Sequence, residues 1–244
     1  AGGYLGDSLA GRATTMLGGL LFGPLLAVYG QVYQTGADAW ELFAWWSLGL
    51  LAYGALSRFV GTGVVALICV HVACFAWLDQ ELGADPFEGS GATLVAVLAL
   101  VDLAVVTLSE LFMAERAQRR IMTHLAAFFA LMLVLPFGVV SLANVPPPGS
   151  GPGLAVLVLG LAGIWLVYRD RRPEIGMLAI FSMIVTILIT TAFGRLLFDG
   201  LDAELFGVAA LGVLVCAQVW MFTRWLLAWR REHHGHPAED GGPS

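Results

Sequence analysis

The sequence has little charge and contains no lysine. Only 12% of its 244 residues are charged and 59% are hydrophobic, whereas a soluble domain averages about 25% charged and about 45–50% apolar residues. All the basic residues are arginines, which indicates a GC-rich bacterial genome. No large polar segment is present that could form a separate soluble domain. This composition excludes an ordinary soluble protein and predicts an integral membrane protein.

Recognisable catalytic motifs are also absent. The sequence contains no HExxH, GxSxG, P-loop or GxGxxG before a helix. Its three cysteines, Cys69, Cys74 and Cys216, lie inside apolar blocks without CxxC spacing, so we interpret them as small buried hydrophobic residues. We therefore expect no metal and no cofactor, and we favour a non-enzymatic protein over an enzyme.

Long apolar blocks dominate the sequence instead. A helix that crosses the hydrocarbon core needs about 20 residues, and backbone groups in lipid must be bonded internally, so each block predicts a helix. Eight blocks qualify, at roughly 13–33, 39–57, 60–78, 91–112, 121–143, 152–168, 174–197 and 203–229. We expect one all-α, polytopic transmembrane domain over residues 1–232 and a disordered cytoplasmic tail over 233–244.

The charged residues between the blocks predict a topology. Cytoplasmic loops carry an excess of arginine, and arginines precede the first block and occupy every second loop: Arg12, Arg58, Arg116, Arg119, Arg120, Arg169, Arg171, Arg172, Arg224, Arg230 and Arg231. The opposite loops hold nine acidic residues and one arginine, Arg195: Asp38, Glu41, Asp79, Glu81, Asp85, Glu88, Asp199, Asp202 and Glu204. Both termini are therefore expected to be cytoplasmic, and the acidic outer face argues against a nucleic-acid partner.

Two ionisable residues lie near the middle of apolar blocks. His71 is in the third block and Asp102 is in the fourth, and a rise of about 1.5 Å per residue puts them at similar depths in consecutive antiparallel helices. We predict that they face each other or a shared cavity. The pair is either a proton or ion site or an interhelical hydrogen bond that fixes packing. Cys74, one turn from His71, makes only a weak zinc site without a fourth ligand.

Several softer features are interpreted as helix packing. Pro136 is expected to kink the fifth span. Thr186, Thr190, Thr191 and Gln218 are expected to bond to their own helix or across to a neighbour. The small-residue steps Gly19/Gly23 and Gly160/Gly163 should allow close helix approach. Arg195 is expected to pair with Asp199, and it is also a candidate for holding an anionic group.

A polar stretch, YGQVYQTGADAWELF (29–43), separates the first two blocks. Asp38 is placed to cap the second span, with Glu41 three residues later, and Trp40 suits the membrane interface. Neither a cap nor a turn explains the remaining polar residues Gln31, Tyr33 and Gln34. We treat Gln31, Tyr33, Gln34, Asp38 and Trp40 as candidate binding or partner residues, and Gln31, Tyr33 and Gln34 are the first place to look for a ligand.

The run from residue 29 to residue 58 resembles a bacterial family of predicted membrane proteins of unknown function (DUF2157). Its members tend to carry a GQ-x-YQTGAD-x-W-x-LF signature, matched here by Gly30, Gln31, Tyr33, Gln34, Thr35, Gly36, Ala37, Asp38, Trp40, Leu42 and Phe43. The stretch 169–198 resembles the distal part of the family less distinctively. The resemblance implies a bacterial inner-membrane protein and no established activity. Because the chain begins with Ala1 and lacks signal-peptide features, we expect its start to be processed or truncated.

Two functions remain open from the sequence. The first is a non-enzymatic component of a complex in the bacterial cytoplasmic membrane, in contact with the bilayer and with a membrane-protein partner through an acidic extracytoplasmic docking face. The alternative is a proton- or ion-coupled transporter or channel that uses His71 and Asp102. A transporter should show a water-accessible cavity that reaches one of these residues.

Overall fold

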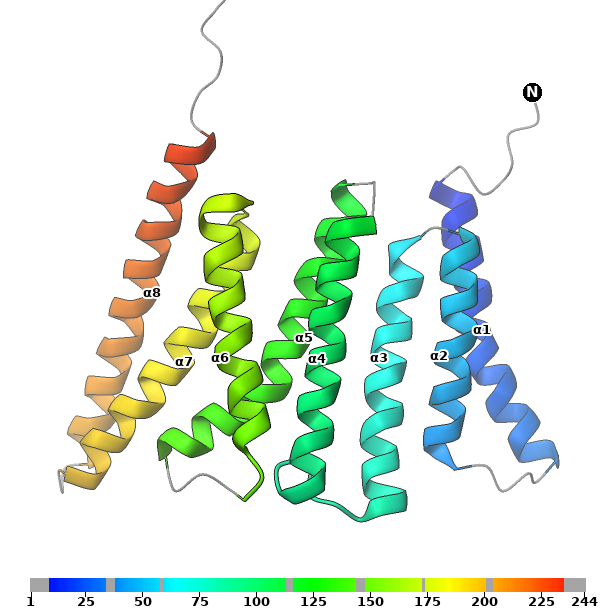
Figure 1. Ribbon diagram of the computed structural model, residues 1–244, viewed down its shortest axis with the longest axis horizontal. Coiled ribbons are helices and arrows are strands. Elements are labelled where there is room, and N and C mark those ends of the chain that lie inside the picture. Colours follow the sequence, from blue (N-terminus) through cyan, green and yellow to red (C-terminus); the bar gives the residue numbers. More distant parts are fainter. Residues whose placement is uncertain are drawn as a thin grey trace, which may run out of the picture. The chain divides into compact units, whose positions relative to one another are not determined.

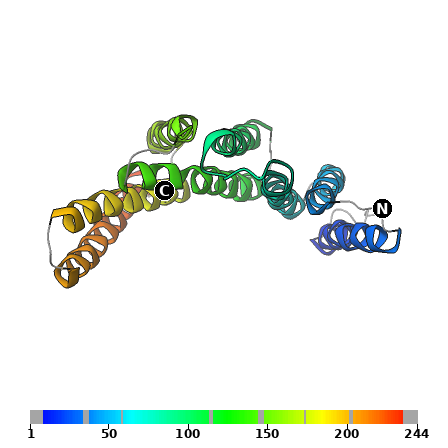
Figure 2. The ribbon, with the colours of Figure 1, turned by 90° about the horizontal axis from the view of Figure 1, so that it is seen from below.

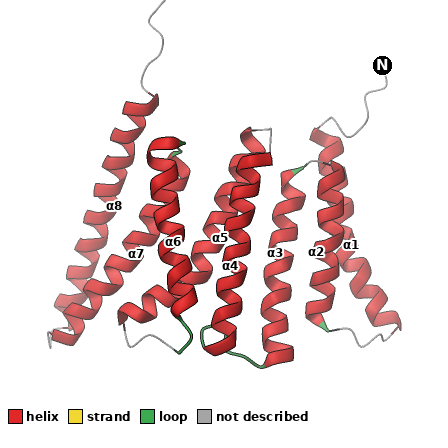
Figure 3. Ribbon diagram, viewed as in Figure 1, coloured by secondary structure: helices red, strands yellow, loops and turns green. Residues whose placement is uncertain are grey.

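The computed structural model describes residues 9–33, 38–57, 59–112, 116–143, 148–172, 174–200 and 204–234. All regular structure in these ranges is helical, as Figures 1 and 3 show. The α-helices are α1 (Leu9–Tyr33), α2 (Ala39–Ser57), α3 (Val60–Trp77), α4 (Gly89–Phe112), α5 (Arg116–Ala143), α6 (Gly151–Leu166), α7 (Ile175–Gly200) and α8 (Glu204–His234). Two π-helical turns, η2 (Leu78–Leu82) and η3 (Val167–Arg171), extend α3 and α6. Every predicted apolar block is thus helical.

Six helical segments within the described residues are long and apolar enough to cross a membrane. They are Val60–Leu82, Gly89–Phe112, Arg120–Ala143, Gly151–Asp170, Ile175–Phe198 and Gly207–Glu232. Helix α1 contributes a shorter apolar segment, Met16–Val32. Helix α2 is not among the six. The all-helical membrane architecture is confirmed, whereas the count of eight spans and the side of each terminus stay predictions.

The chain divides into two compact units, Ala1–Ala126 and Ala127–Ser244, and the boundary falls within α5. Each unit is described by itself below. The single transmembrane domain expected from the sequence stays a prediction. Residues 235–244, most of the expected tail, lie outside the described residues, and α8 extends to His234.

In the first unit, α1 and α2 lie side by side (Figures 1 and 2) and pack aromatic rings against glycines. The indole of Trp46 on α2 lies over Gly23 of α1, and its Nε1–H donates to the carbonyl oxygen of Gly19 at 3.1 Å. In return, Phe22 of α1 lies over Gly49 of α2. The predicted Gly19/Gly23 step therefore allows the close approach, because a side chain at Gly23 would occupy the space of the indole.

The same unit continues its packing through small residues on α3. A buried cluster joins Leu50 of α2 to Ala66 and Cys69 of α3, with Phe43 and Trp46 packed against it. Cys69 is thus a buried apolar residue, as the sequence predicted. The prediction is wrong for Cys216, which is exposed, and Cys74 is only half-buried. Small residues suit helix contacts in membranes because they let the backbones approach closely.

In the second unit, α5 continues through Pro136 to Ala143 and packs against α6 and α7. The ring of Phe137 lies over Gly153 at the start of α6. A Cβ added to Gly138 would come within 2.6 Å of Leu157 of α6 and 2.9 Å of Leu188 of α7. Phe137 and the lack of a side chain at Gly138 therefore set how closely these three helices pack.

The hydroxyl groups of α7 are satisfied mainly within the helix. Thr186 donates to the carbonyl of Ser182 at 2.8 Å, and Thr191 donates to the carbonyl one turn before it at 2.9 Å. Thr190 Oγ1 and both polar side-chain atoms of the buried Gln218 have no hydrogen-bond partner among the described residues. The expected bonding holds for Thr186 and Thr191 and is not observed for Thr190 and Gln218.

The glycine contacts generate the first prediction. Replacing Gly23 by Ala should lower the thermal unfolding midpoint of the protein in detergent, because the new Cβ overlaps the Trp46 indole and overpacking costs about 1–3 kcal/mol. Gly163→Ala is the matched control. No neighbouring atom lies within 4 Å of the Cβ position at Gly163, so the close approach predicted for the Gly160/Gly163 step is wrong at Gly163. Both changes gain about 1 kcal/mol of helix propensity. The packing account fails if the two variants shift the midpoint equally.

Candidate functional site

The predicted contact between His71 and Asp102 is present in the first unit. His71 Nε2 lies 3.0 Å from Asp102 Oδ2, so the pair joins α3 to α4. His71 Nδ1 lies 2.7 Å from the carbonyl oxygen of Leu67, one turn earlier in α3. Asp102 is 0% exposed and His71 is 8% exposed. The two ionisable side chains therefore form a closed contact between adjacent helices.

The hydrogen bonds determine how many protons the pair holds. A carbonyl oxygen only accepts, so Nδ1 of His71 carries a hydrogen and donates it to Leu67. One further proton must then lie between Nε2 and Oδ2, carried either by the imidazole or by the carboxyl group. In both cases the pair has no net charge. This neutrality lowers the cost of burial, because an unpaired ion is far more costly in an apolar interior.

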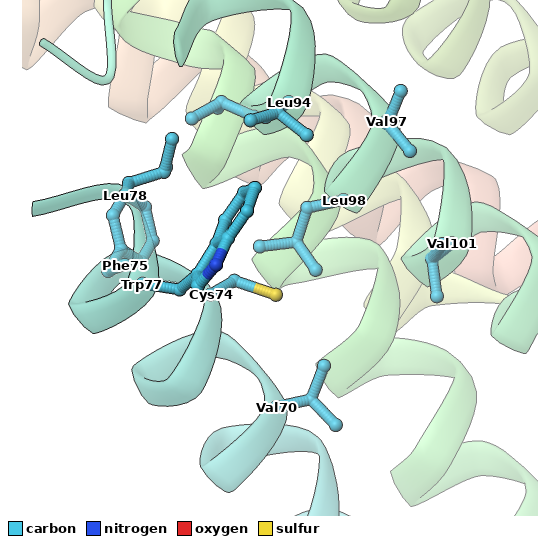
Figure 4. A pocket seen from close by; sticks show the side chains of 10 residues that line it. Val70, Cys74, Phe75, Trp77, Leu78, Leu94, Val97, Leu98 and Val101 are labelled. Carbon is cyan, nitrogen blue, oxygen red and sulfur yellow. The ribbon is translucent and has the colours of Figure 1, made fainter. Parts of the chain in front are cut away.

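An apolar cavity of about 230 Å³ lies between the end of α3 with η2 and the first half of α4 (Figure 4), and neither His71 nor Asp102 lines it, although their sequence neighbours Val70 and Val101 do. It is lined by Val70, Cys74, Phe75, Trp77, Leu78, Leu94, Val95, Val97, Leu98 and Val101. Asp102 Oδ1 is buried and has no hydrogen-bond partner among the described residues. A proton or ion pathway would need polar groups or water at this depth, and the cavity lining supplies almost none.

Cys74 lies in the wall of this cavity, one turn after His71. Among the described residues, no group of three or more His, Cys, Asp or Glu side chains is arranged to hold a metal ion. Cys74 therefore gives no support to a zinc site with His71 and Asp102.

A second feature lies at the end of the first unit where α2 begins and α3 ends. The indole Nε1–H of Trp40 donates to Glu81 Oε1 at 3.2 Å. This hydrogen bond joins the first turn of α2 to η2, across 41 positions in the sequence. It fixes Trp40 and Glu81, two residues that the topology predicted to lie on the same face.

The connection between η2 and α4 is an ordered turn with a defined backbone conformation. Gly83 and Gly89 both have φ of 52°, a left-handed conformation that favours glycine. Between them, Asp85 Oδ1 accepts the backbone N–H of Phe87 at 2.8 Å, a turn typical of aspartate. Gly91 lies against the backbone carbonyl of Asp85, where a side chain would not fit. The turn therefore holds its acidic residues at defined positions.

We call this surface the acidic end and define it by the six carboxylates that lie on it. Five of them are exposed and Glu41 is half-buried: Asp38, Glu41, Asp79, Glu81, Asp85 and Glu88. Residues 38–57 and 59–112 contain no arginine or lysine. No basic side chain from these ranges therefore neutralises the acidic end.

The remaining candidates of the polar stretch are only partly described. Gln31 is exposed in the last turn of α1. The side chain of Tyr33 and all of Gln34 lie outside the described residues. Asp38 directly precedes α2, and its carbonyl accepts the Leu42 N–H at 3.3 Å, as expected for a residue that caps the helix. A ligand-binding role for Gln31, Tyr33 and Gln34 stays a prediction.

Arg195 has a partner that the sequence did not predict. Its guanidinium donates to the carbonyl oxygen of Leu142, near the end of α5, at 3.0 Å. A positive group suits that position, because the last carbonyls of a helix have no partner within it. The side chain of Asp199, the expected partner, lies outside the described residues.

Two contacts were missed by sequence reasoning altogether. Ser109 Oγ and Thr123 Oγ1 form a buried hydrogen bond of 2.8 Å between α4 and α5. Glu81 was counted only as a loop charge, although it accepts the Trp40 bond. For Ser109 and Thr123 a signal existed, because two small polar residues flank the same short loop at similar depth.

Helices of this length and apolarity, with ionisable groups paired inside and charges at the ends, define a polytopic α-helical membrane protein. Residues 3–63 match the model of a family described as "Predicted membrane protein (DUF2157)". The resemblance stated from residues 29–58 is thereby confirmed for that part of the chain. No curated protein and no solved structure matches the chain.

The buried pair generates the second prediction. His71→Ala should lower the free energy of unfolding by about 3–5 kcal/mol, because it leaves a buried carboxyl group without its partner. Asp102→Asn should cost less than about 1.5 kcal/mol, because the amide N–H still donates to Nε2 while Nδ1 keeps its bond to Leu67. Denaturant unfolding in detergent micelles measures both.

Asp102→Ala gives the intermediate case, since it removes the partner of Nε2 without leaving a carboxyl group behind. An Asn variant as unstable as the His71→Ala variant would contradict a hydrogen bond between two uncharged groups, because it would mean that the contact is an ion pair between an imidazolium and a carboxylate.

Proposed function

We propose that the protein is a non-enzymatic component of a bacterial inner-membrane complex and that the acidic end docks a basic segment of a membrane-protein partner. The Trp40–Glu81 hydrogen bond carries this proposal, because it holds the start of α2 against the α3–α4 connection. In the topology inferred from the arginines, with both termini cytoplasmic, the acidic end faces the extracytoplasmic side. The family match supports membrane residence and leaves the activity open.

Charge and rigidity support a docking role for the acidic end. Five of its six carboxylates are exposed, and no arginine or lysine occurs in residues 38–57 or 59–112. A surface of one charge sign steers a partner of the opposite sign and selects against others. The turn between Gly83 and Gly89 fixes the backbone, so less conformational entropy is lost on binding.

The buried pair gives the alternative, a proton- or ion-coupled transporter, little support. A coupling site must be reached by water or polar groups from each side in turn. Asp102 is 0% exposed, and the cavity beside the pair is apolar. The neutral His71–Asp102 contact is better explained as a specific packing bond between α3 and α4.

The absence of lysine gives a sharp test, which is the third prediction. A carbodiimide joins carboxylates directly to primary amines, and this chain has no lysine. Apart from its own N-terminal amine and the amines of lipid headgroups, every such cross-link therefore reports another protein. Treatment of native membranes should join Glu81, Asp85 or Glu88 to lysines of a partner, identified by mass spectrometry of the cross-linked peptides.

Charge-neutral variants then test whether the acidic end holds that partner. Glu81→Gln with Glu88→Gln should reduce its copurification at low salt by about fivefold, while the amide that replaces the Glu81 carboxylate keeps an oxygen for the Trp40 bond. The control is Asp170→Asn with Glu232→Gln, which removes the same charge from exposed residues of the second unit. The docking proposal would be refuted if both double variants retained the partner equally. It would also be refuted if the partner were cross-linked only to carboxylates outside the acidic end.

A further inference from the structure

The second unit gathers arginines where α6 and η3 end, α7 begins and α8 ends. Five of their side chains are described and exposed: Arg169, Arg172, Arg224, Arg230 and Arg231. We call these five residues the basic end. Three acidic residues, Asp170, Glu174 and Glu232, lie near them in sequence. Clusters of arginine at the end of a membrane helix attract anionic lipid headgroups.

A groove at this end is apolar along one part and offers hydrogen-bond donors along the other. It is a shallow, open groove of about 450 Å³ on the surface of α8, lined by residues of that helix alone: Val215, Cys216, Val219, Trp220, Thr223 and Arg224. The part farther from the end of α8 is apolar, and Val219 is 53% exposed. The part nearer the basic end offers the hydroxyl of Thr223 and the guanidinium of Arg224. An apolar run followed by hydrogen-bond donors matches a lipid acyl chain followed by its phosphate.

Arg224 lies deeper than the other arginines of α8. It precedes Arg230 by six residues, or about 9 Å along the helix axis toward the middle of the span, although all three arginines of α8 fall inside the candidate span Gly207–Glu232. Its guanidinium stacks on the Trp220 ring at 4.9 Å from the centroid. Among the described residues, no carboxylate forms a salt bridge with Arg224. A cation at this depth is costly unless an anion compensates it.

An aromatic cluster holds the two sides of the basic end together. Trp165 of α6 stacks on Trp225 of α8, with ring centroids 5.7 Å apart. Arg169 lies over the same Trp165 ring at 4.7 Å, and Trp229 Nε1–H donates to the Arg169 carbonyl at 3.3 Å. The end of α8 is therefore fixed against the end of α6. This fixes the residues adjacent to Trp225, including Arg224, in position.

We propose that this groove binds one anionic phospholipid, with its phosphate on Arg224 and Thr223 and an acyl chain along Val219, Cys216 and Val215. Charge complementarity selects the headgroup, because guanidinium pairs with phosphate through directed hydrogen bonds. The exposed apolar part selects a lipid over free phosphate, which would leave Val219 and Trp220 uncovered. The proposal is independent of the acidic end and its partner.

Cys216 provides a reporter inside the groove, which gives the fourth prediction. It is exposed, whereas Cys69 is buried, so the purified full chain in detergent should react with N-ethylmaleimide at Cys216 and scarcely at Cys69. Phosphatidylglycerol at saturation should slow the alkylation of Cys216 about tenfold, and peptide mass spectrometry measures the rate. Phosphatidylcholine with the same acyl chains should not slow the alkylation, and neither should inorganic phosphate alone. Equal protection by phosphatidylcholine, protection by inorganic phosphate alone, or no protection by phosphatidylglycerol would overturn the proposal.

Two matched variants distinguish lipid binding in the groove from a general attraction of anionic lipid to the positively charged end of the helix. Arg224→Gln should raise the phosphatidylglycerol concentration for half-protection about tenfold, the loss expected from one charge-assisted contact. Arg230→Gln removes the same charge from the same helix but lies outside the groove. This variant should change the phosphatidylglycerol concentration for half-protection less than about twofold. Equal effects of both variants would mean that only the net charge matters and would overturn the proposal. The lipid series on the unaltered protein decides the question even where a variant does not fold.

Discussion

The hydrocarbon core of a bilayer offers no hydrogen-bond partner to a polar group, and this constraint shapes every part of the molecule. The backbone meets it by forming helices throughout the described residues. Polar side chains within the spans meet it in the same way. Ser182 and Thr186 donate to carbonyls one turn earlier, and His71 does the same to Leu67 through Nδ1. The second nitrogen of His71 is then left to bond to the one carboxyl group that α4 carries in mid-span.

The same constraint explains why the helices were predictable from the sequence. Apolar runs near 20 residues long, broken by Asp85-Pro86 and by the proline-rich run at 144–153, leave few alternative helix boundaries. The His71–Asp102 contact was also predictable, because consecutive antiparallel helices bring residues of similar depth together. The position of a residue within its apolar block predicts its depth in the membrane directly.

The sequence does not predict how far each helix is rotated about its own axis or in which direction its side chains point. The Trp40–Glu81 bond depends on the rotamers of two residues 41 positions apart, and Arg195 bonds to the Leu142 carbonyl, a partner that helical spacing does not suggest. Gln218 was expected to find a partner, yet it faces inward without one among the described residues. Which face a uniformly apolar helix turns inward is only weakly encoded, since lipid and protein interior are similarly apolar.

These differences bear on where function resides. A polar group at mid-depth is costly unless it is fully paired, and a paired neutral group such as His71–Asp102 is no longer available to a substrate. The ends of the helices are not restricted in this way, because water and lipid headgroups solvate charge there. Carboxylates collect at one end of the first unit and arginines at one end of the second, each beside hydrogen-bonded tryptophans. Helix packing holds these charged groups at the helix ends, where Arg169 of the basic end also lies 3.6 Å from Asp170. The charged groups on which both proposals depend therefore lie at the ends of the helices, and the packing of the helix interiors holds those ends.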